Sequence, residues 1–220
     1  LALRACLRNI IAKTALGEFL KGYYRNLLQL QSHHVELIVE KNTVDPILRP
    51  VASEYCVPIT SGRGYCSLPP RAAIANRYRK SGKDKLILIL VSDLDADGEE
   101  IAHSFARSMR DDFCVEGVHP VKAALTIGQV DEHALPPSME AKRSSANYRK
   151  FVERFGTDAF ELEALEPADL QNIVRSTIDR VLDVDAFNRE VDTEKQDAAF
   201  LDGVRKTLID TISQMNVDGV

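Results

Sequence analysis

Three aspartates stand at alternate positions in one short segment of the chain, Ser92-Asp-Leu-Asp-Ala-Asp-Gly-Glu-Glu-Ile-Ala-His-Ser104. Asp93, Asp95 and Asp97 match the beginning of an EF-hand calcium loop. An EF-hand also requires a helix before the loop and an acidic ligand at its twelfth position. Here an apolar, strand-like run precedes the loop, and Ser104 stands at the twelfth position. A metal site of another kind is therefore the better interpretation.

The three aspartates can share a metal ion only if the fold brings them together. Residues 85–92 form the most continuous apolar run of the chain and predict a buried strand, which would carry the aspartates at its carboxyl end. Close carboxylates repel one another unless a cation neutralises them, and their hard oxygens favour Mg²⁺ or Mn²⁺. The alternative is that acidic residues at a strand end cap the next helix or face solvent.

A further carboxylate, Glu40, ends the predicted strand at residues 35–40. In a parallel sheet Glu40 would project at the same edge as Asp93 and Asp95, where α/β sheets bind their ligands. We therefore predict one site with Glu40 on one side, Asp93 and Asp95 on the other, and a metal ion between them. Such a site could perform phosphoryl chemistry, because a metal ion holds phosphate oxygens and stabilises the charge on the attacking and leaving oxygens.

Strand-like and helical segments alternate along the middle of the chain, which predicts an α/β fold. Short apolar runs mark the strands, and apolar residues at three- and four-residue spacing mark the helices. We expect an open, mainly parallel, Rossmann-like sheet flanked by helices over residues 35–183, with helical extensions at residues 1–34 and 184–220. The predicted strands are residues 35–40, 57–60, 85–92, 121–125 and 160–165, and the predicted helices are residues 2–31 (one or two helices), 45–55, 68–80, 99–110, 166–182 and 193–215.

Three segments carry a resemblance to a known family by their order: "VEK" at 39–41, "SGRGYCSL" at 61–68 and "SDLDADG" at 92–98. This order resembles the Toprim domain that topoisomerases, primases and OLD-type nucleases share. It is most similar to the A subunit of topoisomerase VI, the Spo-eleven-like group, and to uncharacterised phage and bacterial relatives, which also resemble residues 125–137 and 160–167. Residues 93–102 are similar to the type IA topoisomerase pattern D-x-D-x-E-G-E-x-I-A, with Asp97 in place of the Glu.

The resemblance covers about residues 24–178 and implies a Toprim fold with a Mg²⁺ (or Mn²⁺) site that acts on DNA. By this resemblance Glu40 would be a metal ligand or a general acid/base. Asp93 and Asp95 would be metal ligands with a catalytic role, and Asp97 would be an auxiliary metal ligand.

The chain departs from topoisomerase VI-like proteins in one respect. In that group the tyrosine that attacks DNA lies on a winged-helix domain before the Toprim domain, and only about 34 residues precede the first predicted strand here. Tyr23 and Tyr24 lie in the predicted N-terminal helix, which favours a packing role. Because the sequence begins with Leu1, we interpret it as a fragment or a trimmed chain. A winged-helix domain was then either removed from it or never present.

Three basic residues near the predicted site are candidates for nucleic-acid binding. Arg63 stands between two glycines, which let a backbone approach a phosphate that the arginine could bind. Lys41 could screen the metal site or touch DNA, and Arg71 begins one of two basic stretches that could follow a phosphate backbone. The alternatives are an exposed turn, a solvated lysine and solvated helix faces. The two stretches are Arg71, Arg77, Arg79 and Lys80, and Lys142, Arg143, Arg149, Lys150 and Arg154.

Two glutamates alternate on the predicted strand at residues 160–165. Glu161 and Glu163 would point to one face of that strand. If that face borders the aspartates, the two glutamates could hold a second metal ion or a cation bound to phosphate, so the sequence leaves the number of metal ions open.

Composition limits the possible functions. Of the 220 residues, 45% are hydrophobic and 28% are charged, which suits a globular protein. The net charge of -5 argues against coating of nucleic acid through bulk charge, so DNA binding would need local basic patches or a partner. No apolar run approaches the roughly 20 residues of a membrane span, and no signal-peptide pattern is present. We therefore expect a cytoplasmic protein without membrane contact.

Two functional hypotheses follow. The first is a Mg²⁺-dependent Toprim protein that acts on DNA phosphodiester bonds, as a nuclease or as the metal-binding part of a topoisomerase VI-like cleavage enzyme. The second is a non-catalytic Toprim-fold module of a phage, plasmid or defence system, which binds DNA or a partner chain without cutting. The amphipathic pattern of residues 193–215 would then allow a partner subunit or a homo-oligomer.

Overall fold

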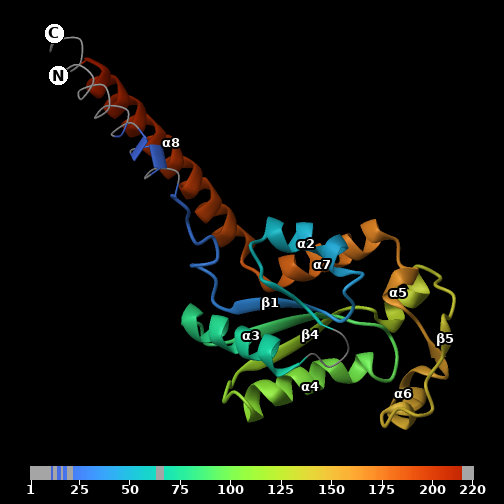
Figure 1. Cartoon of the computed structure of the whole chain (residues 1–220). Coiled ribbons are helices and arrows are strands. Elements are labelled where there is room, and N and C mark those ends of the chain that lie inside the picture. Colours follow the sequence, from blue (N-terminus) through green and yellow to red (C-terminus); the bar gives the residue numbers. More distant parts are fainter. Residues whose placement is uncertain (1–10, 12–13, 16, 19–21, 63–66, 215–220) are drawn as a thin grey trace. The chain divides into compact units, whose positions relative to one another are not determined.

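The structure is a computed structural model that describes residues 11, 14–15, 17–18, 22–62 and 67–214 (Figure 1). The chain divides into two compact units. Residues 31–183 form the first, here named the α/β unit, and Leu1–Leu30 with Val184–Val220 form the second, the helical unit.

Four parallel strands form one sheet in the α/β unit, in the order β2-β1-β3-β4. β1 and β3 pair in continuous register, with Val39 of β1 opposite Val91 of β3. The predicted α/β fold with a parallel, Rossmann-like sheet is therefore confirmed. The strands are β1 (His34–Val39), β2 (Ile59–Ser61), β3 (Leu86–Val91) and β4 (Val118–Ala124).

Helices cover both faces of this sheet. α3 (Leu68–Ser81) and α4 (Gly98–Asp111) lie on one face, and α2 (Asp45–Glu54) and α7 (Pro167–Val181) lie on the other (Figure 1). Proline occupies the first turn of α2, α3 and α7, where its missing N–H group breaks no helical hydrogen bond. α3 ends at Gly82, whose φ of 63° gives the left-handed cap that stops a helix.

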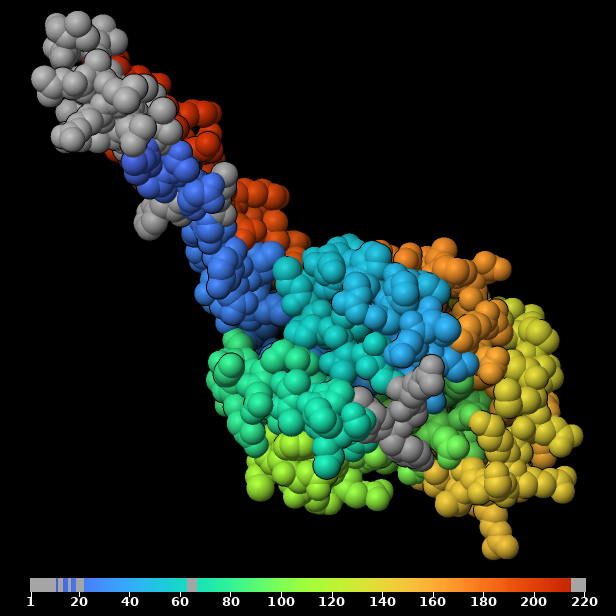
Figure 2. All heavy atoms as spheres, in the orientation of Figure 1, coloured from blue at the N-terminus to red at the C-terminus, as the bar shows by residue number. Residues whose placement is uncertain are grey.

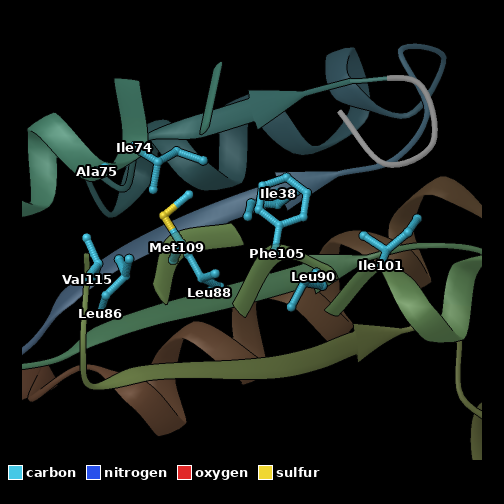
Figure 3. Close-up of a cluster of buried hydrophobic side chains, with 10 residues drawn as sticks. All are labelled: Ile38, Ile74, Ala75, Leu86, Leu88, Leu90, Ile101, Phe105, Met109 and Val115. Atoms are coloured by element: carbon cyan, nitrogen blue, oxygen red, sulfur yellow. The ribbon is translucent and has the colours of Figure 1, made fainter. Parts of the chain in front are cut away.

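The apolar run of β3 is buried on both sides. Its leucines point into one cluster with Ile74 of α3 and Phe105 of α4 (Figure 3). The alternate residues Ile89 and Val91 are also buried, because successive side chains of a strand point to opposite faces. Burial on both faces explains why this run lacks a polar alternation, and it fixes the acidic segment at the carboxyl end of a central strand.

The two outer strands of the sheet are short or interrupted. β2 has three residues, and β4 contains Pro120, which has no N–H group to donate to a neighbouring strand. Proline is tolerated here because β4 pairs with β3 alone.

The strand predicted at residues 160–165 is wrong over most of its length. Only β6 (Asp158–Ala159) pairs as a strand, antiparallel to β5 (Met139–Glu140). Phe160 forms an isolated bridge with Leu94, with hydrogen bonds of 2.9 and 3.0 Å, and the chain then turns into a 3-10 helix at Leu162–Ala164.

Two short helices were not predicted from the sequence. α5 (Ile127–Glu132) starts from a capping box, in which Thr126 and Gln129 bind each other's backbone amides. α6 (Tyr148–Phe155) follows β5. Helices of six and eight residues are too short for a periodic pattern to distinguish them from loops.

The helical unit contains one long helix, α8 (Val184–Gln214), which begins well before the predicted position 193. Residues 23–30 are not helical, contrary to the prediction, and instead contact α8 through side chains. Tyr23 donates a hydrogen bond of 2.5 Å to Asp197, and Arg25 forms an ion pair with Glu190. Tyr24 is 82% exposed, so the expected packing role of this residue is wrong.

Within the described part of the chain, no helix combines the length and the apolar character that crossing a membrane requires.

Candidate functional site

Glu40 and Asp93 meet at the carboxyl ends of the two central strands. The backbone N–H of Glu40 donates to the carbonyl of Val91 at 2.9 Å, which extends the pairing of β1 and β3 by one residue. The N–H of Asp93 then donates to Oε2 of Glu40 at 3.1 Å. The predicted meeting of these two residues at one sheet edge is therefore observed, and it follows from the parallel register.

A network of backbone contacts shapes the acidic loop, which we define as residues 93–97. Oδ1 of Asp95 accepts hydrogen bonds from the N–H groups of Asp97, at 3.0 Å, and Gly98, at 2.6 Å. This oxygen caps the first turn of α4, as the alternative interpretation of the sequence anticipated for acidic residues here. A Cβ atom at position 98 would lie 2.3 Å from the carbonyl oxygen of Asp93, so the loop requires glycine there.

Asp93 is almost fully buried, with 7% of its surface exposed. Its Oδ1 accepts a hydrogen bond of 2.9 Å from the N–H of Leu162, and its Oδ2 lies 2.9 Å from Nζ of Lys41. Burial raises the pKa of Asp93, against the opposing effect of these two donors. The segment after β6 therefore closes over the acidic loop and holds its first carboxylate in place.

Glu40 has the most strongly shifted carboxyl group of the site. Burial raises its pKa to about 7, and repulsion from Asp93 and Asp95 adds to the effect. The N–H of Asp93 and the charge of Lys41 oppose it. Glu40 can therefore exchange a proton near neutral pH, which an ordinary glutamate does not.

Lys41 provides positive charge among these carboxylates. Its Nζ lies 2.7 Å from Oε2 of Glu163, 2.9 Å from Oδ2 of Asp93 and 3.6 Å from Oε1 of Glu161. Burial alone would lower the pKa of Lys41, but the hydrogen bonds to Glu163 and Asp93 raise it. Thr43 donates to Glu163 at 2.9 Å, and the pKa of Glu163 is lowered because these hydrogen bonds outweigh its burial.

Lys122 is a second lysine at the site, and sequence reasoning missed it. It projects from β4, donates to the carbonyl of Asp93 at 3.0 Å and forms an ion pair with Glu99. Burial lowers its pKa, while Glu99 acts in the opposite direction. The available signal was a single charged residue, Lys122, within the otherwise apolar strand predicted at residues 121–125, which proves to be the end of β4.

A cleft of about 350 Å³ opens over the acidic loop. Asp97 lies on its wall, where Oδ1 accepts a hydrogen bond of 2.7 Å from the hydroxyl of Ser145. This contact joins the acidic loop to the segment between β5 and α6. The cleft is lined by Glu40, Lys41, Asp93, Asp95, Asp97, Met139, Lys142, Ala159, Phe160 and Glu161.

The structure does not bring every predicted residue to the cleft. Arg71 is 6% exposed, its guanidinium lies 4.4 Å from the ring centre of Phe105, and it donates to Ser104 at 3.2 Å. These contacts pack α3 against α4, and they account for Arg71 without nucleic acid. Arg63 lies outside the described residues.

The donor chemistry of the cleft fits a hard divalent cation, but the present side-chain positions do not form a ligand shell. No three His, Cys, Asp or Glu side chains are grouped as a metal site among residues 22–62 and 67–214, nor with the few described residues before them. Lys41 contacts one oxygen of Asp93, and backbone amides occupy Oδ1 of Asp95. Burial is the main cause of the raised pKa values of Glu40 and Asp93, and a bound cation would favour the charged form of both carboxyl groups.

Comparison of the chain with family models, with curated proteins and with solved structures finds no match. The residues and their geometry are therefore the basis for assigning a function.

Proposed function

We propose that the chain is a Toprim-like, Mg²⁺-dependent (or Mn²⁺-dependent) protein that acts on DNA phosphodiester bonds. It would do so as a nuclease or as the metal-binding part of a topoisomerase VI-like cleavage enzyme. One observation carries the proposal: Glu40 and Asp93, from neighbouring parallel strands, share a cleft with Asp95 and Asp97 and contact each other at 3.1 Å.

Carboxylate oxygens of Glu40, Asp93 and Asp95 would hold the cation in this proposal. A bound Mg²⁺ would supply charge stabilisation to a phosphoryl group. Alternatively, if Asp93 and Asp95 hold the cation without Glu40, Glu40 could exchange a proton with the attacking or the leaving oxygen, because its pKa without metal is raised to about 7. Lys142, an exposed residue on the cleft wall, could contact a neighbouring phosphate.

Plasmid nicking tests this proposal. Supercoiled plasmid would be incubated with Mg²⁺ or Mn²⁺ and the wild-type chain, Glu40→Gln or Asp93→Asn. We expect nicking by the wild type and a loss of at least about 100-fold in each variant, the usual scale for removing an acid/base or metal ligand. Glu153→Gln, a change in an exposed carboxylate that does not line the cleft, is the control and should retain activity.

Two outcomes would count against it. Nicking that survives both substitutions, in variants that unfold at the wild-type temperature, would exclude the cleft as the active site. Equal loss in Glu153→Gln would show that the assay reports general damage to the fold.

A second candidate function is a non-catalytic module that binds DNA or a partner chain. The ion pair between Lys41 and Asp93 favours it, since this contact neutralises one carboxylate without a metal ion. Retarded migration of DNA without any nicking, at the same protein concentrations, would favour this candidate over the enzyme.

A further inference from the structure

Lys41 is surrounded by three carboxylates from two different parts of the chain. Asp93 comes from the acidic loop, and Glu161 and Glu163 come from the segment after β6. The lysine side chain is 25% exposed, so solvent screens these contacts only in part. One ammonium group therefore serves as the shared positive charge of this cluster.

A divalent cation and Lys41 compete for the same atom. Oδ1 of Asp93 already accepts a hydrogen bond from Leu162, which leaves Oδ2 as the oxygen in contact with Nζ of Lys41. Two cations at contact distance from one oxygen repel each other strongly in a partly buried site. A metal ion on Oδ2 thus requires Lys41 to leave that atom.

The segment after β6 provides alternative carboxylate partners for the ammonium group of Lys41. Glu163 is held by Thr43 and binds Nζ at 2.7 Å, closer than Asp93 does, and Glu161 lies within 3.6 Å. The lysine can therefore release Asp93 and remain paired.

We propose that Lys41 is an internal counter-ion, which a divalent cation displaces from Asp93 and which Glu161 and Glu163 then retain. This inference rests on the proposed function, because the cation is the one assigned to that site. Lys41 would set the affinity for metal and would hold the carboxylates together when no metal is bound. It is a positioning residue rather than a catalytic one.

Calorimetric titration of the full chain with Mg²⁺ tests the displacement. Lys41→Met removes the charge and nearly preserves the length of the side chain. We expect it to bind Mg²⁺ roughly 5- to 10-fold more tightly than the wild type, the scale of one partly exposed ion pair. Lys85→Met is the control, because it removes the same charge from an exposed position before β3, at the opposite end of that strand from Asp93. Its affinity should stay within about twofold of the wild type, since a solvated charge is screened.

Glu163→Gln gives an independent measurement that does not require Lys41→Met to fold. Removing this partner leaves Lys41 more firmly on Asp93, so Mg²⁺ should bind about threefold more weakly, again the scale of an exposed ion pair. In the double variant with Lys41→Met, the affinity should equal that of Lys41→Met alone. If Glu163 were itself a metal ligand, the substitution would weaken binding in both backgrounds, which would overturn the inference.

The remaining outcomes separate this inference from the proposed function. Metal binding by the wild type with equal or weaker binding by Lys41→Met would overturn the role of Lys41 and leave the proposed metal site standing. No heat of Mg²⁺ binding in the wild type or in any variant would overturn both.

Discussion

The carboxyl group of Glu40 determines how the site responds to pH. Folding moves it from water to a partly buried position beside Asp93 and Asp95, which favours its neutral form and raises its pKa to about 7. A carboxyl group with a raised pKa in the folded state favours folding at low pH. That contribution is lost between the unfolded value of 4.5 and about 7 as the pH rises.

Glu40→Gln should therefore stabilise the metal-free protein at high pH. With EDTA present, we expect the free energy of unfolding to exceed that of the wild type by about 1–2 kcal/mol at pH 8, after allowance for the solvated part of the carboxylate. The difference should shrink as the pH falls to 5 and vanish below the unfolded value of 4.5, where Glu40 is protonated in both the folded and the unfolded state. Chemical denaturation at pH 5, 6, 7 and 8 measures it. A difference that stays constant across this range would show that the Glu40 charge is not its cause.

At the scale of elements, the start of α4 and the acidic loop depend on the same contacts for their conformation. Asp95 binds the amides of the first turn, Ser92 donates to the carbonyl of Gly98 at 3.0 Å, and the missing side chain of Gly98 allows the carbonyl of Asp93 to approach. The contacts that start α4 at Gly98 therefore also determine the conformation of the acidic loop.

Gly98→Ala should disturb both the start of α4 and the acidic loop. The added methyl group would lie 2.3 Å from a backbone oxygen, so we expect a loss of about 2–3 kcal/mol in stability and weaker Mg²⁺ binding. Gly128→Ala is the matched control in helix α5, where no atom lies within 4 Å and alanine should be neutral or stabilise by about 0.5–1 kcal/mol. Denaturation and calorimetry on both variants give the comparison. Equal stability of the two would contradict the close approach at position 98.

The elements also show which parts of this structure a sequence can predict. The continuous apolar run of β3 and the glutamate that follows β1 predict the sheet edge, because strands that lie side by side in parallel bring their ends together. The position of Glu161 and Glu163 was not predictable in this way. It depends on the bridge between Phe160 and Leu94, a contact across the fold that no local pattern records.

Lys41 and Lys122 differ in how far the sequence predicts their positions. From the sequence alone, either lysine could have been a solvated side chain, since lysine is usually exposed. The pairing of β1 with β3 brings Lys41 to Asp93, as its expected screening role requires, whereas only the packing of β4 brings Lys122 to the carbonyl of Asp93.

At the scale of the whole molecule, the net charge of -5 opposes DNA binding, whereas the basic residues of one segment favour it. Residues 139–155 carry five basic and two acidic side chains and are drawn in gold on the surface in Figure 2. Lys150 and Arg154 pair with Glu100 and Glu99. The remaining basic residues of this segment, Lys142, Arg143 and Arg149, are exposed.

We therefore expect DNA binding to depend on these three side chains and on salt. Replacing Lys142, Arg143 and Arg149 by glutamine should weaken binding about 10-fold at low salt and reduce the slope of log affinity against log salt by about 2–3. Glutamine at Lys85, Arg107 and Arg110 is the control, because these exposed residues carry the same charge and do not line the cleft. Fluorescence anisotropy with a labelled duplex measures both. The same loss in both triple variants would point to bulk charge instead of a local contact.

Pro120 in β4 has a consequence for self-association. A sheet grows from one molecule to the next when an outer strand offers unpaired N–H and C=O groups to a neighbour. Here one outer strand contains a proline, and the other is three residues long. Neither offers a long template for another strand, which protects a protein with so apolar a central strand from edge-to-edge aggregation. Among the described residues, β2 and β4 therefore offer a second copy of this chain little backbone to pair with.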